Sequence, residues 1–308
     1  MERSHRLRTL ARVRALVVTA ALTLSFAAAA ASLAGPSRSA AASDVYKGLG
    51  TWVDVYDAKA FAQPEATAAA IASHGVRTVY VETSNSKQTA DIVKPNALGR
   101  LVDALHHNEV EVVAWYLPSL TKPAVDLRRS LAAIRFATPE GGGFQGFALD
   151  IEAPDVRNPT VRNARVLALS RQLRAAAAPD FGLGAIIPSP RGMEIRPAYW
   201  PGFPYAQLAG LYDVFLPMTY FTGSVKGPDA VYGYLARSLA ILRTKTQNPD
   251  LPIHLIAGVA DRATLPEVQS FAQLVSDDIG IGGWSLYDYF TMRSAEWHAL
   301  AGLDSSRP

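Results

Sequence analysis

The sequence predicts an α/β protein with a single domain, a (β/α)₈ or TIM barrel that follows a signal peptide. Short runs rich in apolar, β-branched and aromatic residues recur eight times after residue 42, and they are continuously apolar rather than alternating. Such runs are typical of parallel strands that are covered on both faces. Most of the segments between them have apolar residues at helical spacing. Eight strand–helix units in about 250 residues match a closed barrel.

Each element follows from these patterns. The expected strands cover residues 48–55, 78–83, 110–117, 147–151, 182–187, 214–218, 253–259 and 281–286. The expected helices cover residues 66–74, 98–107, 127–136, 161–177, 205–211, 232–244, 265–276 and 294–300. An open, doubly wound sheet is the alternative, but no Gly-x-Gly-x-x-Gly follows the first strand, and the glycines at 141–143 precede a strand. The barrel is therefore the preferred fold.

Residues 1–42 are interpreted as a secretory signal peptide. Five arginines lie between residues 3 and 14, an Ala/Leu/Val-rich stretch covers residues 15–34, and Ala40, Ala41 and Ala42 form a small-residue cleavage site. An uncleaved leader that anchors the chain in a membrane is the alternative. The sequence contains no cysteine, which excludes lipid attachment at cysteine and disulfides. We expect a secreted, extracellular protein with no stable membrane insertion after cleavage.

The charge of the chain depends on this leader. Its six arginines and one glutamate give net +5, so residues 43–308 of a chain with net charge +3 have net charge −2. The basic character thus belongs to the leader, and a nucleic-acid partner loses its main support. Residues 43–308 are long enough to bury a stable core as one domain, which we expect to be a monomer.

The most informative motif is Gly146-Phe-Ala-Leu-Asp150-Ile-Glu152, at the end of the fourth expected strand. Side chains two positions apart on a strand point the same way, so Asp150 and Glu152 share one face. Active sites of barrels lie at this end of the strands. Two close carboxylates disfavour joint ionisation, and a carboxylic acid that stays protonated can donate to a glycosidic oxygen. The alternative is a helix-capping or salt-bridging pair.

Acids and aromatic residues dominate the other expected strand ends. Aromatic rings stack on sugar rings, and acids bind hydroxyl groups, so we expect a carbohydrate substrate. The residues expected to bind it are Asp54, Glu82, Trp115, Tyr116, Arg191, Met218, Trp284 and Asp288. The proline-rich segment 189–205 is interpreted as a rigid loop in place of a full fifth helix, as a glycan-binding wall, or as both.

Metal and nucleophile sites find little support. His106 and His107 are adjacent and therefore face different directions, and neither His-x-x-x-His nor Gly-x-Ser-x-Gly occurs. We expect no metal and no cofactor.

These motifs resemble those of glycoside hydrolase family 18, which contains chitinases and endo-β-N-acetylglucosaminidases. The family's strand-four motif, Asp-Gly-x-Asp-x-Asp-x-Glu, keeps its last two acids as Asp150 and Glu152. Its strand-six Met-x-Tyr is similar to Met218-Thr-Tyr220, and its strand-eight tryptophan to Trp284. The resemblance implies catalytic roles for Glu152 as proton donor, for Asp150 beside a charged intermediate and for Tyr220 on the substrate's acetamido group. Trp284 would lie beneath the sugar.

The chain also departs from the family pattern. The inner aspartate of the strand-four motif is Ala148, the first one is missing, and the acid that usually follows Met-x-Tyr is Phe221. A barrel that binds carbohydrate or cell wall without turnover is therefore one alternative. A hydrolase of a non-acetylated polysaccharide, with a second acid at Asp54, Glu82 or Asp261, is another. Family 25 lysozymes also use such a pair with an acid on strand one, but they leave Met218-Thr-Tyr220 unexplained.

Overall fold

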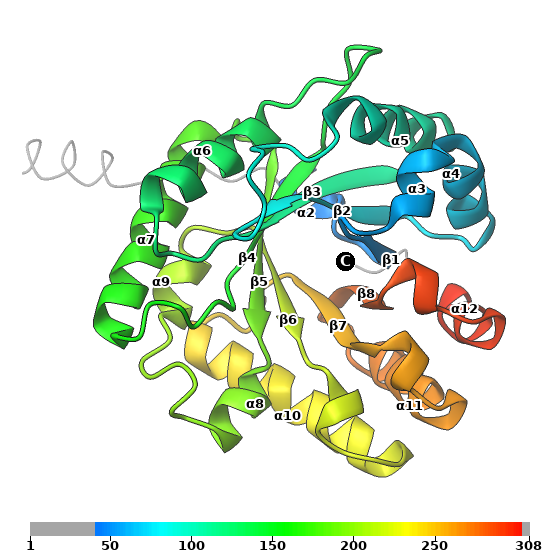
Figure 1. Cartoon of the computed structure of the whole chain (residues 1–308). Helices are drawn as coiled ribbons and strands as arrows, with labels where there is room; N and C mark the ends of the chain where they lie inside the picture. The colour runs from blue at the N-terminus through cyan, green and yellow to red at the C-terminus, as the bar shows by residue number, and fades with distance from the viewer. Residues whose placement is uncertain (1–40, 304–308) are drawn as a thin grey trace, which may run out of the picture. The chain divides into compact units, whose positions relative to one another are not determined.

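The computed structural model describes residues 41–303. Within them, eight parallel strands close into a barrel in chain order, and helices surround it (Figure 1). The predicted fold is confirmed. The strands are β1 (Gly48–Val53), β2 (Thr78–Asn85), β3 (Glu111–Leu117), β4 (Gly146–Asp150), β5 (Gly182–Pro188), β6 (Val214–Met218), β7 (Ile253–Val259) and β8 (Ile281–Tyr287). Residues 1–40 of the predicted signal peptide lie outside the described residues.

Five helices begin earlier than their apolar spacing predicts, whereas the helices that start at Tyr205, Leu265 and Ser294 begin at the expected residues. The longer ones are α4 (Pro64–Ser73), α5 (Pro95–His107), α6 (Pro123–Ile134), α7 (Pro159–Ala176), α10 (Pro228–Thr246), α11 (Leu265–Asp277) and α12 (Ser294–Ala301). Five of them start at a proline, two to four residues before the expected start. Proline is favoured at the first helical position because its missing N–H would have no partner there.

Short helices make up the remaining connections. They are α2 (Ala41–Asp44), α3 (Ala58–Ala62), α8 (Pro190–Ile195) and α9 (Tyr205–Ala209), with 3₁₀ turns η1 (Phe221–Gly223), η2 (Ala260–Arg262) and η3 (Tyr289–Thr291). The fifth strand–helix connection is therefore irregular. It consists of α8, a loop and the five-residue α9.

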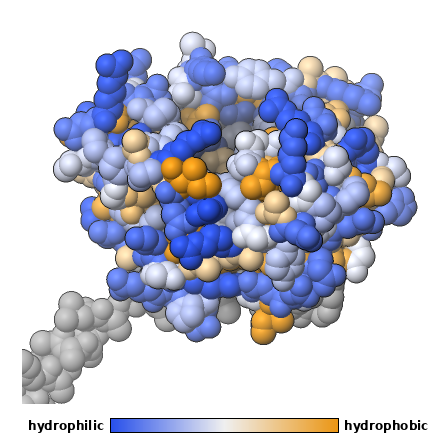
Figure 2. Space-filling view, turned by 90° about the horizontal axis from the view of Figure 1, so that it is seen from below, coloured by the Kyte–Doolittle hydropathy of each residue, from blue (hydrophilic) through white to orange (hydrophobic). Residues whose placement is uncertain are grey.

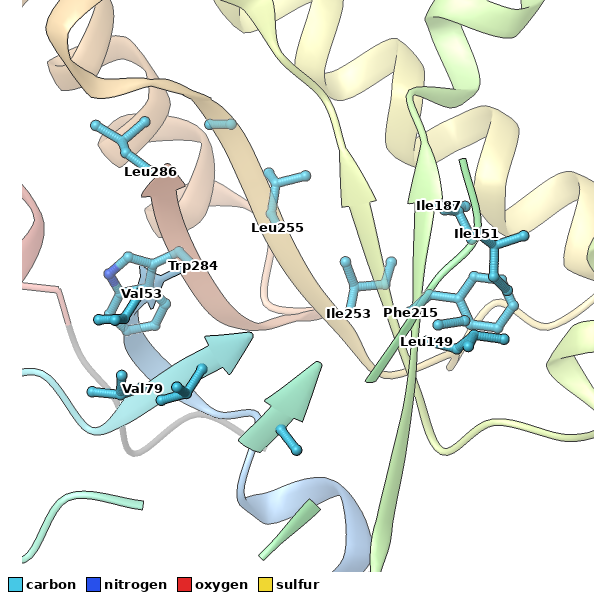
Figure 3. Packing of buried hydrophobic residues seen from close by; sticks show 14 of the residues in the cluster. Val53, Val79, Leu149, Ile151, Ile187, Phe215, Ile253, Leu255, Trp284 and Leu286 are labelled. Atoms are coloured by element: carbon cyan, nitrogen blue, oxygen red, sulfur yellow. The ribbon is translucent and has the colours of Figure 1, made fainter. Parts of the chain in front are cut away.

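The strands bury two layers of side chains. One layer fills the barrel and includes Trp52, Tyr80, Val113, Trp115, Ala148, Ile186, Leu216 and Ile256. The other faces the helices and includes Val53, Val79, Leu149, Ile187, Phe215, Leu255 and Trp284 (Figure 3). Neighbouring side chains on a strand alternate between these two layers. Only every second residue of a strand can therefore reach the barrel mouth.

The barrel is closed at its N-terminal end by the segment that follows α2. The hydroxyl group of Tyr46 lies 3.1 Å from the carbonyl oxygens of both Phe147 and Gly182, to which it can donate. A Cβ atom at Gly182 would lie 2.9 Å from the Tyr46 ring, so glycine makes room for the ring. The predicted cleavage position after Ala42 falls inside α2, where Ala42 is buried.

Replacing Tyr46 with Phe is expected to lower the free energy of unfolding by about 1–2 kcal/mol, because two buried carbonyl groups lose the one hydroxyl donor that they share. Denaturant titration measures the change. Tyr232→Phe is the control, since the Tyr232 hydroxyl donates to Asp277 at an exposed position. An equal loss in both variants would mean that the buried hydrogen bonds of Tyr46 add no more stability than the exposed hydrogen bond of Tyr232.

A polar cluster lies in the barrel interior next to Tyr46, which closes the N-terminal end of the barrel. The ring of His254 lies 3.0 Å from the Tyr80 hydroxyl, 2.8 Å from the Tyr46 carbonyl oxygen and 2.9 Å from Ser285 Oγ. Trp52 Nε1 donates to the same serine over 2.9 Å. Burial lowers the pKa of His254 to about 4, so the ring is neutral at pH 7. The interior is thus a filled core rather than a channel.

The outer surface is mixed. No helix within residues 41–303 combines the length and apolar character needed to cross a membrane. The face in Figure 2 is mostly hydrophilic, with apolar residues in small separate groups.

Candidate active site

The fourth strand brings Asp150 and Glu152 to the barrel mouth. Ala148 and Asp150 face the interior, Ile151 faces the helices, and Glu152 follows the end of β4. Both acids line a pocket of about 450 Å³ at the C-terminal ends of the strands. Its other lining residues include the acids Asp54 and Glu82 and the aromatic residues Tyr56, Trp115, Tyr220 and Tyr287, together with Asn85, Lys87, Met218 and Arg262. The two carboxylates therefore meet where substrates of barrel enzymes bind.

Asp150 is the most buried acid of the pair. Its side chain is 6% exposed, and Oδ1 has no hydrogen-bond partner among the described residues. Burial raises the pKa of Asp150 well above its usual range, and the nearby charges of Glu152 and Glu82 raise it further. A negative charge here is costly until a positive group enters the pocket. Asp150 therefore tends to keep its proton in this pocket.

Glu152 lies closer to solvent. Burial raises the pKa of Glu152 as well. The hydroxyl group of Tyr199 donates to the backbone carbonyl of Glu152 over 2.6 Å and so links the end of β4 to the segment between α8 and α9. A carboxyl group with a raised pKa, within reach of solvent and substrate, is suited to general acid catalysis.

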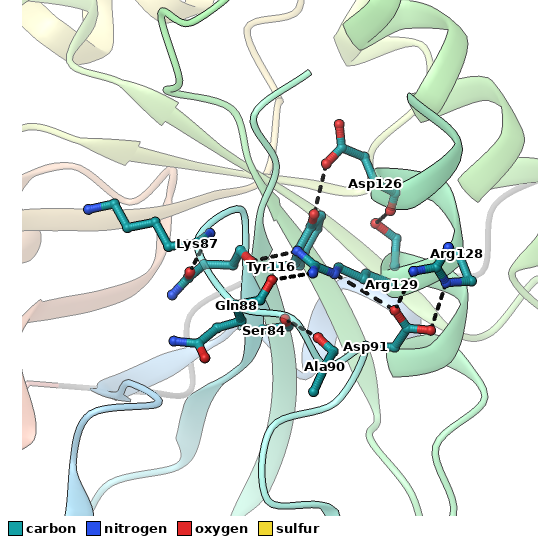
Figure 4. Close-up of polar contacts among 11 residues, drawn as sticks. Ser84, Lys87, Gln88, Ala90, Asp91, Tyr116, Asp126, Arg128 and Arg129 are labelled. Carbon is teal, nitrogen blue, oxygen red and sulfur yellow. Dashed lines mark hydrogen bonds and ion pairs between the residues drawn. The ribbon is translucent and has the colours of Figure 1, made fainter. Parts of the chain in front are cut away.

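Glu82 supplies a third buried carboxyl group. It is 3% exposed and accepts hydrogen bonds from the Val55 N–H over 3.0 Å and from Asn85 Nδ2 over 2.9 Å. Arg129 binds the backbone carbonyls of Asn85 and Gln88 and so holds the loop after β2 (Figure 4). Burial raises the pKa of Glu82 to about 7.

The stability of the fold is expected to depend on whether the carboxyl group of Glu82 carries its proton. The pKa of Glu82 is raised from 4.5 to about 7 on folding, so its contribution to stability is full below pH 4.5 and is lost as the pH rises through 7. Glu82→Gln removes the titration. Relative to wild type, its free energy of unfolding is therefore expected to rise by on the order of 2 kcal/mol between pH 4.5 and pH 7.5.

Denaturant titrations across this pH range measure the difference. The same substitution at Glu65, on the exposed face of α4, is the reference. A Glu82→Gln difference that stays constant with pH would show that Glu82 does not retain its proton in the folded state.

Three further acids cluster at the ends of β1 and β8. Carboxylate oxygens of Asp54, Asp57 and Asp288 lie within 4.8 Å of one another, and this is the one group in residues 41–303 that could hold a metal ion. Asp54 already accepts from the Tyr287 hydroxyl over 3.0 Å, Asp57 from the Asp54 N–H over 2.8 Å, and Asp288 from Thr291. Burial raises the pKa of Asp57 to about 7. The cluster is therefore tied together by bonds within the chain.

The prediction that Trp284 lies beneath the sugar is wrong. Its side chain is 1% exposed and belongs to the layer that faces the helices, and its Nε1 donates to the Leu300 carbonyl over 3.1 Å (Figure 3). On β8 the positions that face the barrel are 283, 285 and 287, so Tyr287 reaches the pocket instead. An alternation count from Ser285, whose small polar side chain suits the interior, would have identified Tyr287.

Three more predicted binding residues do not line the pocket. Tyr116 faces the helices, where its hydroxyl donates to Asp126 over 2.8 Å (Figure 4). Alternation explains this error too, since the preceding Trp115 faces the barrel. Arg191 does not line the pocket, and its guanidinium group pairs with Glu194. Asp288 caps η3 beside the pocket without lining it. The structure brings together the other predicted residues: Asp54, Glu82, Trp115, Asp150, Glu152, Met218 and Tyr220.

A tryptophan lies beside Ala148, the residue at the position of the inner aspartate in glycoside hydrolase family 18. Ala148 is in register with Trp115 on β3, and both side chains face the barrel interior. The indole ring of Trp115 lies edge-on to Trp52, with centroids 6.1 Å apart. Trp115 Nε1 is buried without a hydrogen-bond partner among the described residues. A large aromatic side chain thus fills interior space next to the position where the family has an acid.

Comparisons with known proteins support the fold. No protein-family model matches the chain, and no curated protein matches it significantly. Solved structures do match. The spore cortex-lytic enzyme SleL of Bacillus cereus has a TM-score of 0.62 at 11% identity, over 82% of this chain and 73% of that one. A chitinase of Bacteroides thetaiotaomicron has a TM-score of 0.60 at 10% identity, over 83% and 95% of the two chains.

A third match has a different substrate in its name. The endo-β-1,4-mannanase of Thermotoga petrophila has a TM-score of 0.59 at 10% identity, over 79% of this chain and 68% of that one. At such low identity, these similarities establish the barrel fold alone.

Proposed function

We propose that the protein is a glycoside hydrolase that cleaves β-glycosidic bonds in glycans containing N-acetylhexosamine, such as chitin, peptidoglycan or N-glycans. The observation that carries the proposal is the pair Asp150 and Glu152 in a pocket at the barrel mouth, each with a raised pKa. The resemblance to family 18 and the structural similarity to a chitinase and a cortex-lytic enzyme support it.

In this proposal Glu152 donates its proton to the glycosidic oxygen. The carbonyl oxygen of the substrate's 2-acetamido group attacks the anomeric carbon as the bond to the leaving sugar breaks, which gives an oxazolinium ion. Glu152, now a carboxylate, then accepts a proton from the water molecule that opens this ring. No carboxylate of the protein is needed as a nucleophile.

The neighbouring residues stabilise this sequence. In this proposal, ionised Asp150 offsets the positive charge of the oxazolinium ion, which gives a role to a carboxyl group whose ionisation is otherwise costly. Tyr220 lines the same pocket and can donate to the acetamido oxygen. Groups of this kind, positioned before the reaction, contribute about 3–4 kcal/mol each to the stability of a transition state.

A second candidate is a hydrolase of a non-acetylated polysaccharide with two catalytic carboxylates. It is favoured by Glu82, a third buried acid of the same pocket whose pKa is about 7, and by the similarity to a mannanase. In that case Glu82 or Asp54 would join Glu152 as nucleophile or base. The two candidates differ in whether the acetamido group is required.

A glycan panel tests the proposal. The protein is incubated with matched oligosaccharides of N-acetylglucosamine, glucosamine and mannose, and new reducing ends are measured. Cleavage of the acetylated series alone is expected. Cleavage of mannose oligomers would favour the second candidate, and binding without cleavage would favour a carbohydrate-binding barrel.

We also propose that the protein is secreted, on the strength of the predicted leader. Mass spectrometry of the protein from the culture medium tests this and locates the cleavage position. Because Ala42 is buried within α2, we expect the mature chain to retain α2. A cell-bound, full-length protein would contradict secretion.

A further inference from the structure

Two basic residues line the catalytic pocket, which is the pocket that contains Asp150 and Glu152. Lys87 lies in the loop after β2, and Arg262 ends η2, the turn after β7. Both side chains are exposed, and neither has an ion-pair or hydrogen-bond partner within residues 41–303. The mechanism proposed above uses neither residue. Their positive charges are therefore available to a ligand.

The backbone at Lys87 is held by hydrogen bonds on both sides. The Lys87 N–H donates to Asn85 Oδ1 over 3.0 Å. The buried guanidinium group of Arg129 donates to the carbonyl oxygen of Asn85 over 2.7 Å and to that of Gln88. Figure 4 shows the Lys87 side chain extending away from these contacts. The cation thus projects from an anchored loop, so binding does not have to order the backbone there.

The turn that carries Arg262 is anchored as well. Before the turn, the Val259 N–H donates to Thr222 Oγ1 over 3.2 Å. After the turn, the Ala263 carbonyl oxygen accepts from Arg293 over 2.7 Å. The second cation therefore also projects from a fixed backbone.

The two cations flank one side of the pocket. In the closed barrel, β2 and β7 lie on the two sides of β1 and β8, so Lys87 and Arg262 enclose the ends of these strands. There Tyr56, which is 61% exposed, lines the pocket together with Tyr287 and Asp54. The Asp54 carboxylate accepts from the Tyr56 N–H over 2.7 Å and from the Tyr287 hydroxyl over 3.0 Å. This side thus offers aromatic rings to a sugar, and its acid is already hydrogen-bonded.

The interior of the pocket is acidic in composition but weakly charged. Burial raises the pKa of Glu82 to about 7, and it raises the pKa values of Asp150 and Glu152. Glu82 and Asp150 are buried, whereas the two cations are exposed. Positive charge is therefore found at the rim of the pocket. This pattern matches a ligand that is neutral where it reacts and negative at its edges.

We propose that Lys87 and Arg262 bind carboxylate groups of the glycan, so that the protein prefers N-acetylhexosamine glycans with acidic substituents to neutral chitin. The inference rests on the proposed function for the rest of the substrate. Two kinds of glycan place a carboxylate beside an N-acetylhexosamine unit: one carries a lactyl ether, as in N-acetylmuramic acid, and the other alternates with a uronic acid. Because exposed ion pairs are individually weak, the two cations set a preference among glycans rather than the whole affinity.

Matched oligosaccharides test the inference. An oligosaccharide of N-acetylglucosamine and N-acetylmuramic acid is compared with its methyl ester, which lacks the charge, and with a chitin oligosaccharide of equal length. At low salt, kcat/KM of the wild type is expected to be about fivefold higher on the free acid than on the ester, mainly through KM. High salt is expected to remove this preference, since it screens exposed charges. A hyaluronan oligosaccharide serves as the uronic acid substrate, and a preference for either acidic glycan over chitin supports the inference.

Variants of the two cations locate the preference. Lys87→Gln and Arg262→Gln are each expected to lower kcat/KM on the preferred acid by about twofold to threefold and to leave activity on the ester unchanged. The double variant is expected to lose the preference. Lys245→Gln on α10 and Arg100→Gln on α5 are the matched controls, because both residues are exposed and neither lines the catalytic pocket. Melting temperatures verify that all variants are folded.

Failures of the two proposals can be told apart. If the wild type cleaves the acidic glycans, the ester and the chitin oligosaccharide equally well, the cations do not select the substrate, and the proposed function stands. A preference for the acid that persists in the double variant would also overturn the inference. If the wild type cleaves none of these glycans, the proposed function fails, and calorimetric titration with the free acid and the ester decides the inference. Equal affinities would then overturn it, whereas a preference that the double variant loses would support it.

Discussion

Replacing Glu152 with Gln is expected to lower kcat on an N-acetylglucosamine oligosaccharide by about 10²–10⁴-fold. The amide has nearly the same shape but cannot protonate the leaving oxygen, and a sugar alkoxide is a poor leaving group. Reducing-end release under saturating substrate measures the loss. Binding is expected to persist, since the pocket keeps its other lining residues.

The leaving group provides the control for this prediction. A glycosyl fluoride carries fluoride in place of the leaving sugar, and fluoride departs without strong acid assistance. Glu152→Gln is therefore expected to lose far less activity on N-acetylglucosaminyl fluoride than on the oligosaccharide. Glu65→Gln, on the exposed face of α4, is expected to match wild type on both substrates. If the Glu152→Gln variant still hydrolysed the oligosaccharide at a wild-type rate, Glu152 would not be the proton donor.

Replacing Asp150 with Asn is expected to lower kcat by about 10²–10³-fold, because the neutral amide does not offset the positive charge of the oxazolinium ion. Its effect on stability is expected to have the opposite sign. Burial raises the pKa of Asp150. The contribution of this carboxyl group to stability is therefore lost as the pH rises above the ordinary pKa of an aspartate in the unfolded chain. Asn removes that loss, and the melting temperature at pH 7.5 is expected to rise.

Kinetics and calorimetry on one preparation test both parts. A variant that loses activity and gains thermal stability has lost a functional charge rather than a structural bond. Lower activity together with a lower melting temperature would instead mean that Asp150 supports the fold, in spite of its unpartnered Oδ1.

The fold can be predicted because the sequence contains both apolar patterns, the continuous runs of buried parallel strands and the helical spacing of the helices between them. Strands such as Val214–Met218 are continuously apolar, and β6 and β7 match their predicted bounds. The pair Asp150 and Glu152 can be placed for the same reason, since a carboxylate at the end of an apolar strand points where the alternation directs it. For the five helices that start with a proline, apolar spacing predicts the start two to four residues too late, because the first apolar residue of the pattern lies inside the helix.

The remaining features depend on how the barrel closes. Residue type and position predict Trp284 and Tyr116 at the mouth, whereas a shift of one residue along a strand moves a side chain to the opposite face. Tyr46 bonds to β4 and β5 from a segment more than 100 residues away, and no local pattern indicates such a contact. A hollow of about 370 Å³ beside the catalytic pocket likewise exists because α8 and its loop meet η1 in space.

The most direct test of the proposed mechanism is the anomeric form of the first product. Proton NMR follows the wild-type protein with a β-linked N-acetylglucosamine oligosaccharide from the first turnovers, before mutarotation. Attack by the substrate's own acetamido group, followed by water, predicts that the β-anomer appears first. Initial release of the α-anomer would mean direct attack by water opposite the leaving group, and it would contradict the roles proposed for Asp150 and Glu152.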